Sequence, residues 1–374
     1  MPSMANAPHR IQYVVSTLAA TGPTRQLLNI VTNLNRSHYA PHVVTLSPEP
    51  DQSYHGLFRD ADVPVTSLAL SRAGGLVLGP SRLRSITTAI DPDVVHTQGI
   101  RADSLAAHCL FAYPQVTTLR NFPPEDYIPR YGAVLGRLMA WQQFRTARLA
   151  DQPVACSETI RDRYRGRDVA AIAIRNGVDA ESYTPPSKAE RERIRAELGF
   201  EQGETVVISV GGLIERKDPE TVIDGFQRSE TSETGSLLLL GDGPLANQCR
   251  VRAGPSVSLL GHIDDVARYL RAADVFVSAS HSEGLPNAVM EALATSVPAV
   301  LSDIGPHQEI LSVNPDGGAL FERSDPDALA RTLDTVAGSV EDRRQAARNA
   351  IETELNAVTM TQRYESVYDD LIDC

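Results

Sequence analysis

Short apolar segments alternate with amphipathic segments along the chain, and this alternation limits the fold more than any other feature. The apolar segments are rich in Val, Ile and Leu, as is typical of buried strands. The expected strands span 11–17, 43–46, 65–68, 94–97 and 115–119, and then 205–210, 236–240, 257–260, 275–278, 299–302 and 319–321. Helical patterns occupy 24–34, 82–90, 102–110, 189–198, 328–336, 340–355 and 359–372. Repeated strand–helix units favour an α/β architecture with parallel, doubly wound sheets.

The length of the chain indicates two such sheets. A chain of 374 residues exceeds the size that one hydrophobic core usually serves. Its 42% of hydrophobic residues is enough to fill two ordinary cores. The proline-rich stretch 183–187 separates the two sets of strands. We therefore expect an N-terminal domain over residues 1–182 and a C-terminal domain over residues 183–357.

The segment that follows the expected strand 275–278 has the strongest functional pattern. Two glutamates, Glu283 and Glu291, flank a helix start formed by Gly284, Leu285, Pro286 and Asn287. The free N–H groups of a helix start favour an anion such as a diphosphate. The carboxylates would repel phosphate but accept hydrogen bonds from hydroxyls. This combination fits a nucleotide diphosphate sugar. The alternative interpretation is an ordinary loop followed by a helix whose glutamate faces solvent.

The spacing of Glu283 and Glu291 resembles the signature of the family 4 retaining glycosyltransferases, also called glycosyl transferases group 1. Other segments match the family in its own order, from residue 176 to residue 310. They are Asn176-Gly177-Val178-Asp179, residues 210–218, Gly241-Asp242-Gly243-Pro244, Gly261-His262-Ile263, and Asp303-Ile304-Gly305-Pro306 with Glu309. The N-terminal half matches more loosely, through Gly22-Pro23 and residues 91–96.

This resemblance implies the GT-B fold, in which two Rossmann-like domains face an interdomain cleft. The N-terminal domain would bind the acceptor, with a helix at 358–374 packing back on it, and the C-terminal domain would bind the nucleotide sugar. The implied reaction is metal-independent, retaining hexosyl transfer from a nucleotide diphosphate sugar to a lipid-linked or polysaccharide acceptor. A UDP-sugar is favoured by its frequency in the family, and no cofactor is expected. Two alternatives stay open: a nucleotide-sugar epimerase of the same fold, and a catalytically silent sugar-nucleotide-binding partner of another transferase.

The resemblance also assigns roles in the C-terminal domain. Glu291 would bind the ribose, and Glu283 would hold hydroxyls of the donor sugar. The cations Arg216 and Lys217 would stabilise the diphosphate as negative charge grows on it, unless they are merely a solvated pair on a loop. Donor binding is further assigned to Gly211, Gly212, Gly241, Gly243, His262 and Ile263. Gly212 stands where similar sequences usually have arginine, and Arg216 is the expected substitute.

Five residues are expected to line the cleft from the N-terminal domain. They are Gly22, Pro23, His96, Arg120 and Asn176. Gly22 and Pro23 follow the first strand and begin a helix, so they form either a second anion or sugar site or a plain turn. Arg120 stands where many relatives have histidine, and a guanidinium cannot accept a proton. His96 is either a cleft residue or a structural histidine at a strand end.

The charge is distributed unevenly along the chain. The formal net charge is −12, yet residues 1–180 are net positive and the remainder is strongly acidic. The acidic half offers no continuous basic face for nucleic acid, whereas the basic half fits a surface that meets anionic lipid. Residues 127–150 combine four arginines with apolar residues and the single tryptophan, Trp141. This pattern predicts either a membrane-surface element or a helix that buries its apolar side in its own domain.

The remaining motifs favour a cytoplasmic protein with possible peripheral contact at the inner face of the cell membrane. No apolar run reaches the roughly 18 residues of a membrane span, and residues 1–10 lack the apolar stretch of a secretory signal. The cysteines Cys109, Cys156, Cys249 and Cys374 match no metal or redox spacing. The Asp-x-Asp pairs at 60–62 and 91–93 precede strands, so we interpret them as loop caps and expect no metal site.

Overall fold

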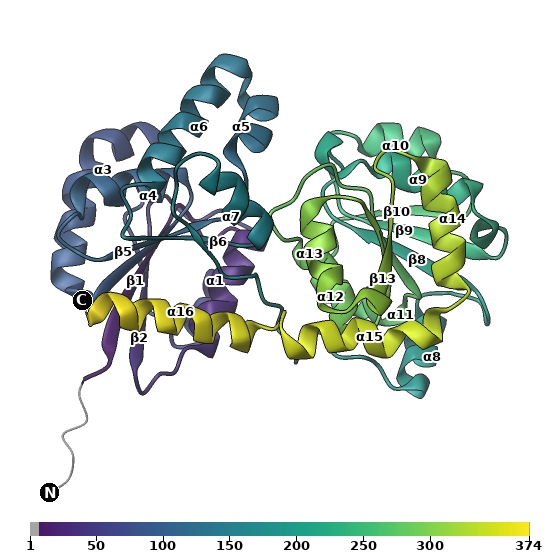
Figure 1. Ribbon diagram of the computed structural model, residues 1–374. Coiled ribbons are helices and arrows are strands. Elements are labelled where there is room, and N and C mark those ends of the chain that lie inside the picture. Colours follow the sequence, from purple (N-terminus) through teal and green to yellow (C-terminus); the bar gives the residue numbers. More distant parts are fainter. Residues whose placement is uncertain (1–6, 374) are drawn as a thin grey trace, which may run out of the picture. The chain divides into compact units, whose positions relative to one another are not determined.

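The computed structural model describes residues 7–373, with the side chains of Arg72, Ala73 and Leu76 excepted. Its contacts divide the chain into two compact units (Figure 1). Unit 1 contains the residues up to Asn176 and those from Ala357 onward, and unit 2 contains Gly177–Asn356. The unit boundaries therefore fall six residues and one residue earlier than the positions expected from the sequence. Cys374 and residues 1–6 lie outside the described part of the chain.

Unit 1 is built on a parallel sheet of seven strands in the order β3-β2-β1-β4-β5-β6-β7. The strands are β1 (His9–Val15), β2 (Tyr39–Thr45), β3 (Val65–Ser67), β4 (Val94–Gln98), β5 (Gln115–Leu119), β6 (Gln152–Ala155) and β7 (Ile172–Ala173). The helices are α1 (Gly22–Asn33), α2 (His55–Asp60), α3 (Arg72–Ile90), α4 (Ile100–Cys109), α5 (Pro123–Tyr131), α6 (Ala133–Ala147), α7 (Glu158–Arg165) and α16 (Ala357–Ile372). The sequence patterns did not predict β6 and β7, which are short and lie at one edge of the sheet.

Unit 2 is built on a parallel sheet of six strands in the order β10-β9-β8-β11-β12-β13. The strands are β8 (Thr205–Val210), β9 (Gly235–Leu240), β10 (Val257–Gly261), β11 (Val275–Ser278), β12 (Ala299–Ser302) and β13 (Gly318–Phe321). The α-helices are α8 (Lys188–Glu197), α9 (Pro219–Arg228), α10 (Ala246–Arg252), α11 (Val266–Ala272), α12 (Asn287–Ala294), α13 (Gly305–Val313), α14 (Pro326–Ala337) and α15 (Val340–Thr353). Three short 3-10 helices, η1 (Glu215–Lys217), η2 (Glu230–Glu233) and η3 (Pro315–Gly317), complete the unit.

Both faces of each sheet are buried, which explains why the strands read as continuous apolar runs. In β8, Val206 and Ile208 face the core that α12 and α15 cover, whereas Val207 faces the core that α9 and α14 cover. Unit 1 repeats this division, with Tyr13 of β1 on one face and Val14 on the other. The expected α/β class with two Rossmann-like, doubly wound parallel sheets is confirmed.

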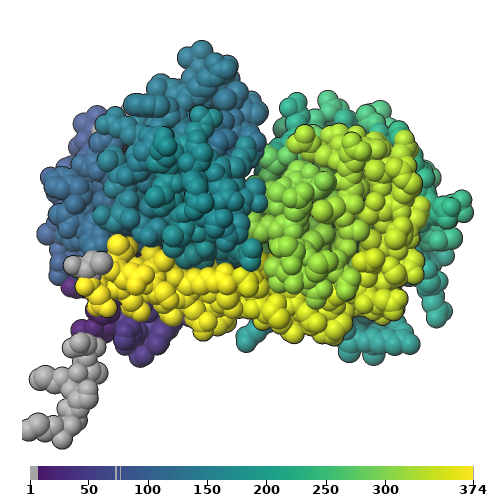
Figure 2. Space-filling model, in the orientation of Figure 1, coloured from purple at the N-terminus to yellow at the C-terminus, as the bar shows by residue number. Residues whose placement is uncertain are grey.

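The last helix, α16, belongs to the core of unit 1 although it follows unit 2 in the sequence (yellow in Figures 1 and 2). Its residues Tyr364 and Tyr368 are fully buried together with Tyr13 of the central strand β1. The hydroxyl groups of Tyr13 and Tyr368 are 3.1 Å apart, within hydrogen-bond distance. The chain therefore crosses twice between the units, once in each direction.

The loop after β9 depends on a glycine at position 241. Gly241 has a φ of +143°, and a Cβ added there would lie 2.0 Å from the backbone oxygen of Gly211. We expect Gly241→Ala to destabilise unit 2 by about 3 kcal/mol or more, through strain and overpacking together. A loss of that size would lower the unit 2 transition in differential scanning calorimetry by about 6–12 °C.

Gly203→Ala is the matched control for this substitution. Gly203 also has a positive φ, +84°, and lies in unit 2, but a Cβ there would have nothing within 4 Å. Its replacement adds only the left-handed strain of about 1–2 kcal/mol. Equal melting temperatures for the two variants would contradict the close approach of the two loops as the cause.

Candidate functional site

The topology of unit 2 fixes where a ligand can bind. Ligands of open α/β sheets bind outside the carboxyl ends of the strands, where the strand order reverses. In unit 2 this reversal lies between β8 and β11, the two central strands. The loop after β8 leads to η1 with Arg216 and Lys217, and the loop after β11 carries Glu283. The three residues expected to be catalytic therefore meet at this end of the sheet.

Glu283 forms ion pairs with both cations. Its Oε2 lies 2.9 Å from Nη1 of Arg216, and its Oε1 lies 2.5 Å from Nζ of Lys217. The hydroxyl of Ser280 donates a further hydrogen bond of 2.8 Å to Oε1. The Glu283 side chain is only 7% exposed. The sequence placed these residues in one site, but the structure adds that the carboxylate and the cations bind one another.

The ion pairs with Arg216 and Lys217 keep Glu283 negatively charged. Burial on its own would raise the pKa of the carboxyl group, because it disfavours the charged form. Lys217 and Arg216 outweigh burial, and with the hydrogen bonds from Lys217 and Ser280 they lower the pKa to about 2. Glu283 is therefore ionised at neutral pH.

The two cations are more accessible than the carboxylate that they bind. The side chain of Arg216 is 34% exposed and that of Lys217 is 22% exposed. A backbone hydrogen bond of 2.8 Å from His281 N to Arg216 O joins η1 to the loop of Glu283. Arg216 also donates a 2.5 Å bond to the carbonyl oxygen of Ser282. A ligand can thus reach the outer sides of two fixed cations while Glu283 stays beneath them.

Glycines allow the neighbouring loops to approach this site closely. An added Cβ at Gly211 would lie 3.6 Å from Cε of Lys217, so the lysine stem runs directly over this glycine. Gly212, where an arginine was expected from the resemblance, is exposed. Gly243, in the loop after β9, lies against Leu213 in the loop after β8. A Cβ added at Gly243 would come within 2.4 Å of the backbone oxygen of Leu213. The Gly-rich ends of β8 and β9 therefore form one packed rim beside Lys217.

The other residues assigned to donor binding lie on the loop after β10, on the loop after β11 and on α12. The His262 side chain is exposed and lies 3.3 Å from a carboxylate oxygen of Asp264, whereas Ile263 packs partly on the core. Leu285 and Pro286 are buried, and α12 begins at Asn287. Glu291 lies on α12, four residues after Asn287, so the two residues share one face of the helix.

His307 is a buried histidine near the charges of Glu283 and Lys217 that the sequence analysis did not single out. It lies in the first turn of α13, fully buried, with Nδ1 2.8 Å from the carbonyl oxygen of Ser302. Its Nε2 is buried and has no hydrogen-bond partner among residues 7–373. Burial lowers its pKa to about 4, and the charges of Glu283 and Lys217 also act on it. Its position just after the carboxyl end of β12, the strand beside β11, was the signal in the sequence.

The structure corrects the placement of His96 in a cleft. Its ring is fully buried in unit 1, with Nδ1 2.8 Å from the Tyr368 hydroxyl and Nε2 2.6 Å from the Thr118 hydroxyl. Burial, reinforced by the charge of Arg120, lowers its pKa to about 3. Both ring nitrogens therefore have partners in the core, and His96 holds α16 against the sheet.

Arg120 and Asn176 lie together in unit 1. Arg120 donates a 2.6 Å bond to the side-chain oxygen of Asn176 and a 3.2 Å bond to that of Gln98. Gln98 is the last residue of β4, Arg120 directly follows β5, and Asn176 follows β7. The three side chains therefore lie at the carboxyl ends of the strands. Gly22 and Pro23 are exposed at the first turn of α1, which follows β1.

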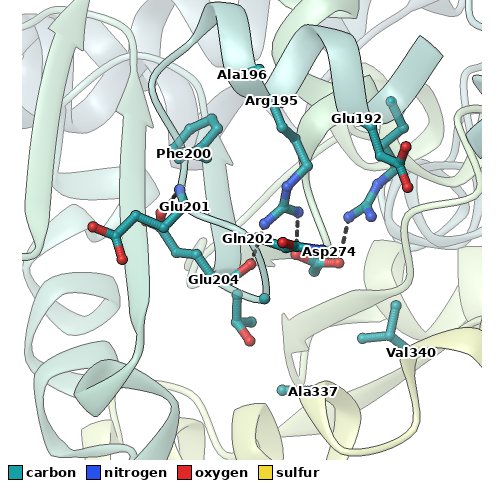
Figure 3. A pocket seen from close by; sticks show the side chains of 13 residues that line it. Glu192, Arg195, Ala196, Phe200, Glu201, Gln202, Glu204, Asp274, Ala337 and Val340 are labelled. Carbon is teal, nitrogen blue, oxygen red and sulfur yellow. Dashed lines mark hydrogen bonds and ion pairs between the residues drawn. The ribbon is translucent and has the colours of Figure 1, made fainter. Parts of the chain in front are cut away.

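A cavity of about 520 Å³ in unit 2 lies away from these residues (Figure 3). It opens at the start of β8 and next to Asp274, which immediately precedes β11, so it lies at the amino ends of the strands. Asp274 accepts bonds from Arg191 at 2.5 Å, Arg195 at 2.9 Å and Arg344 at 3.3 Å. This network ties α8 and α15 to the central strands, and we interpret it as structural.

Arg10 contacts one of the two aspartate pairs. Its backbone N–H donates a 2.7 Å bond to the Asp93 carboxylate, and its guanidinium donates a 2.7 Å bond to the Asp91 carboxylate. Cys109, Cys156 and Cys249 are buried. Across residues 7–373, no three His, Cys, Asp or Glu side chains are grouped as metal ligands would be. In the same part of the chain, every helix is too short or too polar to cross a bilayer.

Two doubly wound sheets, with a cationic loop and a glycine-rich rim at the carboxyl end of the second, define a GT-B protein. Comparison with known families agrees with this class. Residues 190–353 match the model of the family described as Glycosyl transferases group 1, and residues 20–182 match that of Glycosyltransferase Family 4. The chain belongs to the family 4, group 1 glycosyltransferases.

Individual relatives are distant. The chain is 28% identical over 214 residues to the UDP-Gal:alpha-D-GlcNAc-diphosphoundecaprenol alpha-1,3-galactosyltransferase of Escherichia coli, a match covering 53% of this chain and 54% of that protein. The matched part thus spans about half the length of that relative. A GDP-mannose-dependent alpha-mannosyltransferase of Mycobacterium tuberculosis is 25% identical, covering 83% of this chain and 84% of that protein.

Solved structures support the fold. HepE of Anabaena in complex with UDP superposes with a TM-score of 0.80 and 19% identity, over 96% of this chain and 100% of that chain. Sucrose-phosphate synthase of Thermosynechococcus elongatus gives a TM-score of 0.81 and 17% identity, over 98% of this chain and 99% of that chain.

Proposed function

We propose that this protein is a retaining glycosyltransferase that moves a sugar from a nucleotide diphosphate sugar to an acceptor hydroxyl. The observation that supports it most is the buried Glu283 carboxylate with Arg216 and Lys217 bound to it at the carboxyl ends of β8 and β11. Two fixed cations beside a helix start suit a diphosphate, and a buried carboxylate suits the hydroxyls of a sugar.

The proposed chemistry uses the cations as preorganised electrostatic stabilisers. The bond between the anomeric carbon and the phosphate oxygen breaks, and the acceptor oxygen bonds to the same face of that carbon. The acceptor proton passes to the leaving phosphate. Arg216 and Lys217 stabilise the charge that develops on the diphosphate, without a metal ion.

Glu283 has one hydrogen-bond acceptor position left for the sugar in this scheme. Its two oxygens can accept about four hydrogen bonds, and Lys217, Ser280 and Arg216 occupy three of these positions. The remaining position would accept a donor-sugar hydroxyl and orient the anomeric carbon. Because its pKa is about 2, Glu283 would act as an anion that stabilises positive charge on the sugar, and we do not assign it as a nucleophile.

The donor is proposed to be a UDP-sugar and the acceptor a lipid-linked sugar or a polysaccharide. The E. coli relative is named for UDP-Gal and a diphosphoundecaprenol acceptor, and HepE was solved with UDP. The mycobacterial relative is named for GDP-mannose, so a test of the donor must compare UDP with GDP.

Thermal-shift measurements with UDP, GDP and their sugars test this proposal. Binding raises the melting temperature according to affinity and concentration. We expect UDP to raise it more than GDP does, with the shift intact in the presence of a chelator. Glu291→Ala should reduce the UDP shift, since its carboxylate is proposed to bind the ribose. A shift abolished by the chelator would contradict the metal-independent scheme, and no release of UDP from any UDP-sugar with any acceptor would contradict transfer.

A further inference from the structure

The helix α6 exposes four large apolar side chains. Val134 is 87% exposed, Leu135 50%, Leu138 58% and Trp141 54%. Val134, Leu138 and Trp141 are spaced by four and three residues, which places them on one stripe of the helix. Apolar side chains of this size normally face the core when a helix packs only on its own domain.

The buried side of α6 carries small and polar residues instead. Gly136 packs against the backbone of α5, because an added Cβ would lie 2.6 Å from Cα of Ile128. Ala140 is buried, and the side-chain oxygen of Gln143 accepts a 2.5 Å bond from the Tyr127 hydroxyl. Phe144 is the large apolar residue of the helix that enters the core. The helix is therefore well anchored in unit 1 by one side, while the larger apolar surface faces outward.

Positive charge surrounds this exposed stripe. Arg130, Arg137, Arg145 and Arg148 are all exposed, and the sequence has no Asp or Glu from residue 127 to residue 150. The guanidinium of Arg145 lies 5.7 Å from the ring centroid of Trp141. On a chain of net charge −12, this is a local reversal of sign.

We propose that the outer face of α6, formed by Val134, Leu135, Leu138 and Trp141, docks on an anionic lipid surface. The apolar stripe would enter the boundary between headgroups and acyl chains, about 5–10 Å deep, with α6 parallel to the membrane plane. Tryptophan and arginine are suited to this boundary, and each arginine near an anionic surface adds attraction that salt weakens. Figures 1 and 2 show α5 and α6 projecting from the rest of their unit, and the side chains of the stripe are exposed. The proposal is independent of the proposed sugar transfer.

The single tryptophan of the chain reports on this surface directly. The purified protein is mixed with vesicles of phosphatidylcholine, with and without phosphatidylglycerol, while Trp141 emission is recorded. We expect a blue shift and quenching by brominated acyl chains with the anionic vesicles only. Raising the salt from about 0.1 M to about 1 M shortens the Debye length from about 10 Å to about 3 Å, and should weaken binding markedly.

The double variant Leu135→Gln, Leu138→Gln tests the apolar stripe. We expect its vesicle affinity, measured by co-sedimentation, to fall roughly tenfold or more, because two partly inserted leucines are lost. The matched control is Val251→Gln on α10 of unit 2, which is 90% exposed and should bind vesicles as the unaltered protein does. Circular dichroism and the UDP thermal shift should be unchanged in both variants, which separates lost lipid binding from misfolding and from a failure of the proposed sugar chemistry.

Several outcomes would overturn this proposal. They are equal binding to neutral and anionic vesicles, no change in Trp141 emission with any vesicle, and unaltered affinity of the double variant. Concentration-dependent self-association that the double variant abolishes, without vesicle binding, would assign the face to a second copy of the chain and so exclude lipid docking.

Discussion

Replacing Lys217 with methionine is expected to lower kcat for sugar transfer by about 10²–10³-fold. Methionine keeps much of the length of the lysine stem but removes the charge that lies 2.5 Å from Glu283 and beside Gly211. The leaving diphosphate would then gain its negative charge with one cation, Arg216, in place of two. The measurement is UDP release under saturating donor, with the thermal shift by UDP recorded in parallel.

The chain supplies its own control for this experiment. Its only other lysine, Lys188, is exposed at the start of α8 in the same unit. Lys188→Met should change kcat by less than about twofold, as is usual for a surface substitution away from a site. A small effect at Lys217, comparable to that at Lys188, would remove the cationic loop from the mechanism.

Glu283→Ala is expected to reduce kcat by about 100-fold or more, because the sugar would lose the group that orients it. UDP affinity should remain the same or increase, because the carboxylate that now neutralises Arg216 and Lys217 would be gone. Isothermal titration with UDP and steady-state kinetics on one preparation give both quantities. Equal losses of binding and transfer would contradict the division of roles between Glu283 and the cations.

A neighbouring glutamate provides a control for Glu283→Ala. Glu215 is exposed on the same loop as Arg216, so Glu215→Ala should retain nearly full activity.

Since the pKa of Glu283 is about 2, the group stays ionised between about pH 5 and pH 9. The pH profile of a Glu283→Gln variant should therefore keep its shape, while the rate falls at every pH in this range. The unfolded-state pKa of a glutamate is near 4.3, so the ion pairs stabilise the fold above that pH and lose this effect as the pH falls towards about 2.

The strands that lie in the middle of each sheet were predictable because both faces are buried. The patterns predicted β5, β8, β11 and β12 with their observed bounds, and each contains at least three consecutive buried residues. The edge strand β7 has only two residues, one of them exposed, so it leaves no such run. Helix α3 was predicted only from residue 82 onward, because Pro80 lies inside it and usually ends a helical pattern.

The residues of the site could be predicted from the sequence, but the contacts between them could not. The loop position of Glu283 after a buried strand and the motif of Arg216 and Lys217 could both be recognised in the sequence. Their ion pairing depends on β8 and β11 being neighbours, which follows from strand order and not from local pattern. His96 was misplaced for the same reason, because the tyrosines that bury it come from α16, far along the chain.

The orientation of α6 on its domain could not be predicted from the sequence either. A periodic pattern gives the two sides of a helix but not which side meets the domain. In the structure Gly136 approaches Ile128 on α5 closely and Phe144 enters the core, while Val134, Leu138 and Trp141 face outward.

The return of α16 to unit 1 has a consequence for biosynthesis. Domains generally fold as units while the chain is still being translated, the N-terminal one first. Here the buried partners of Tyr13 and His96 are Tyr364 and Tyr368, which a ribosome adds after all of unit 2. Unit 2, continuous from Gly177 to Asn356, therefore has all its residues before unit 1 does. Until translation reaches α16, the residues of the first sheet that pack against this helix lack their partners, so the core of unit 1 is completed after that of unit 2.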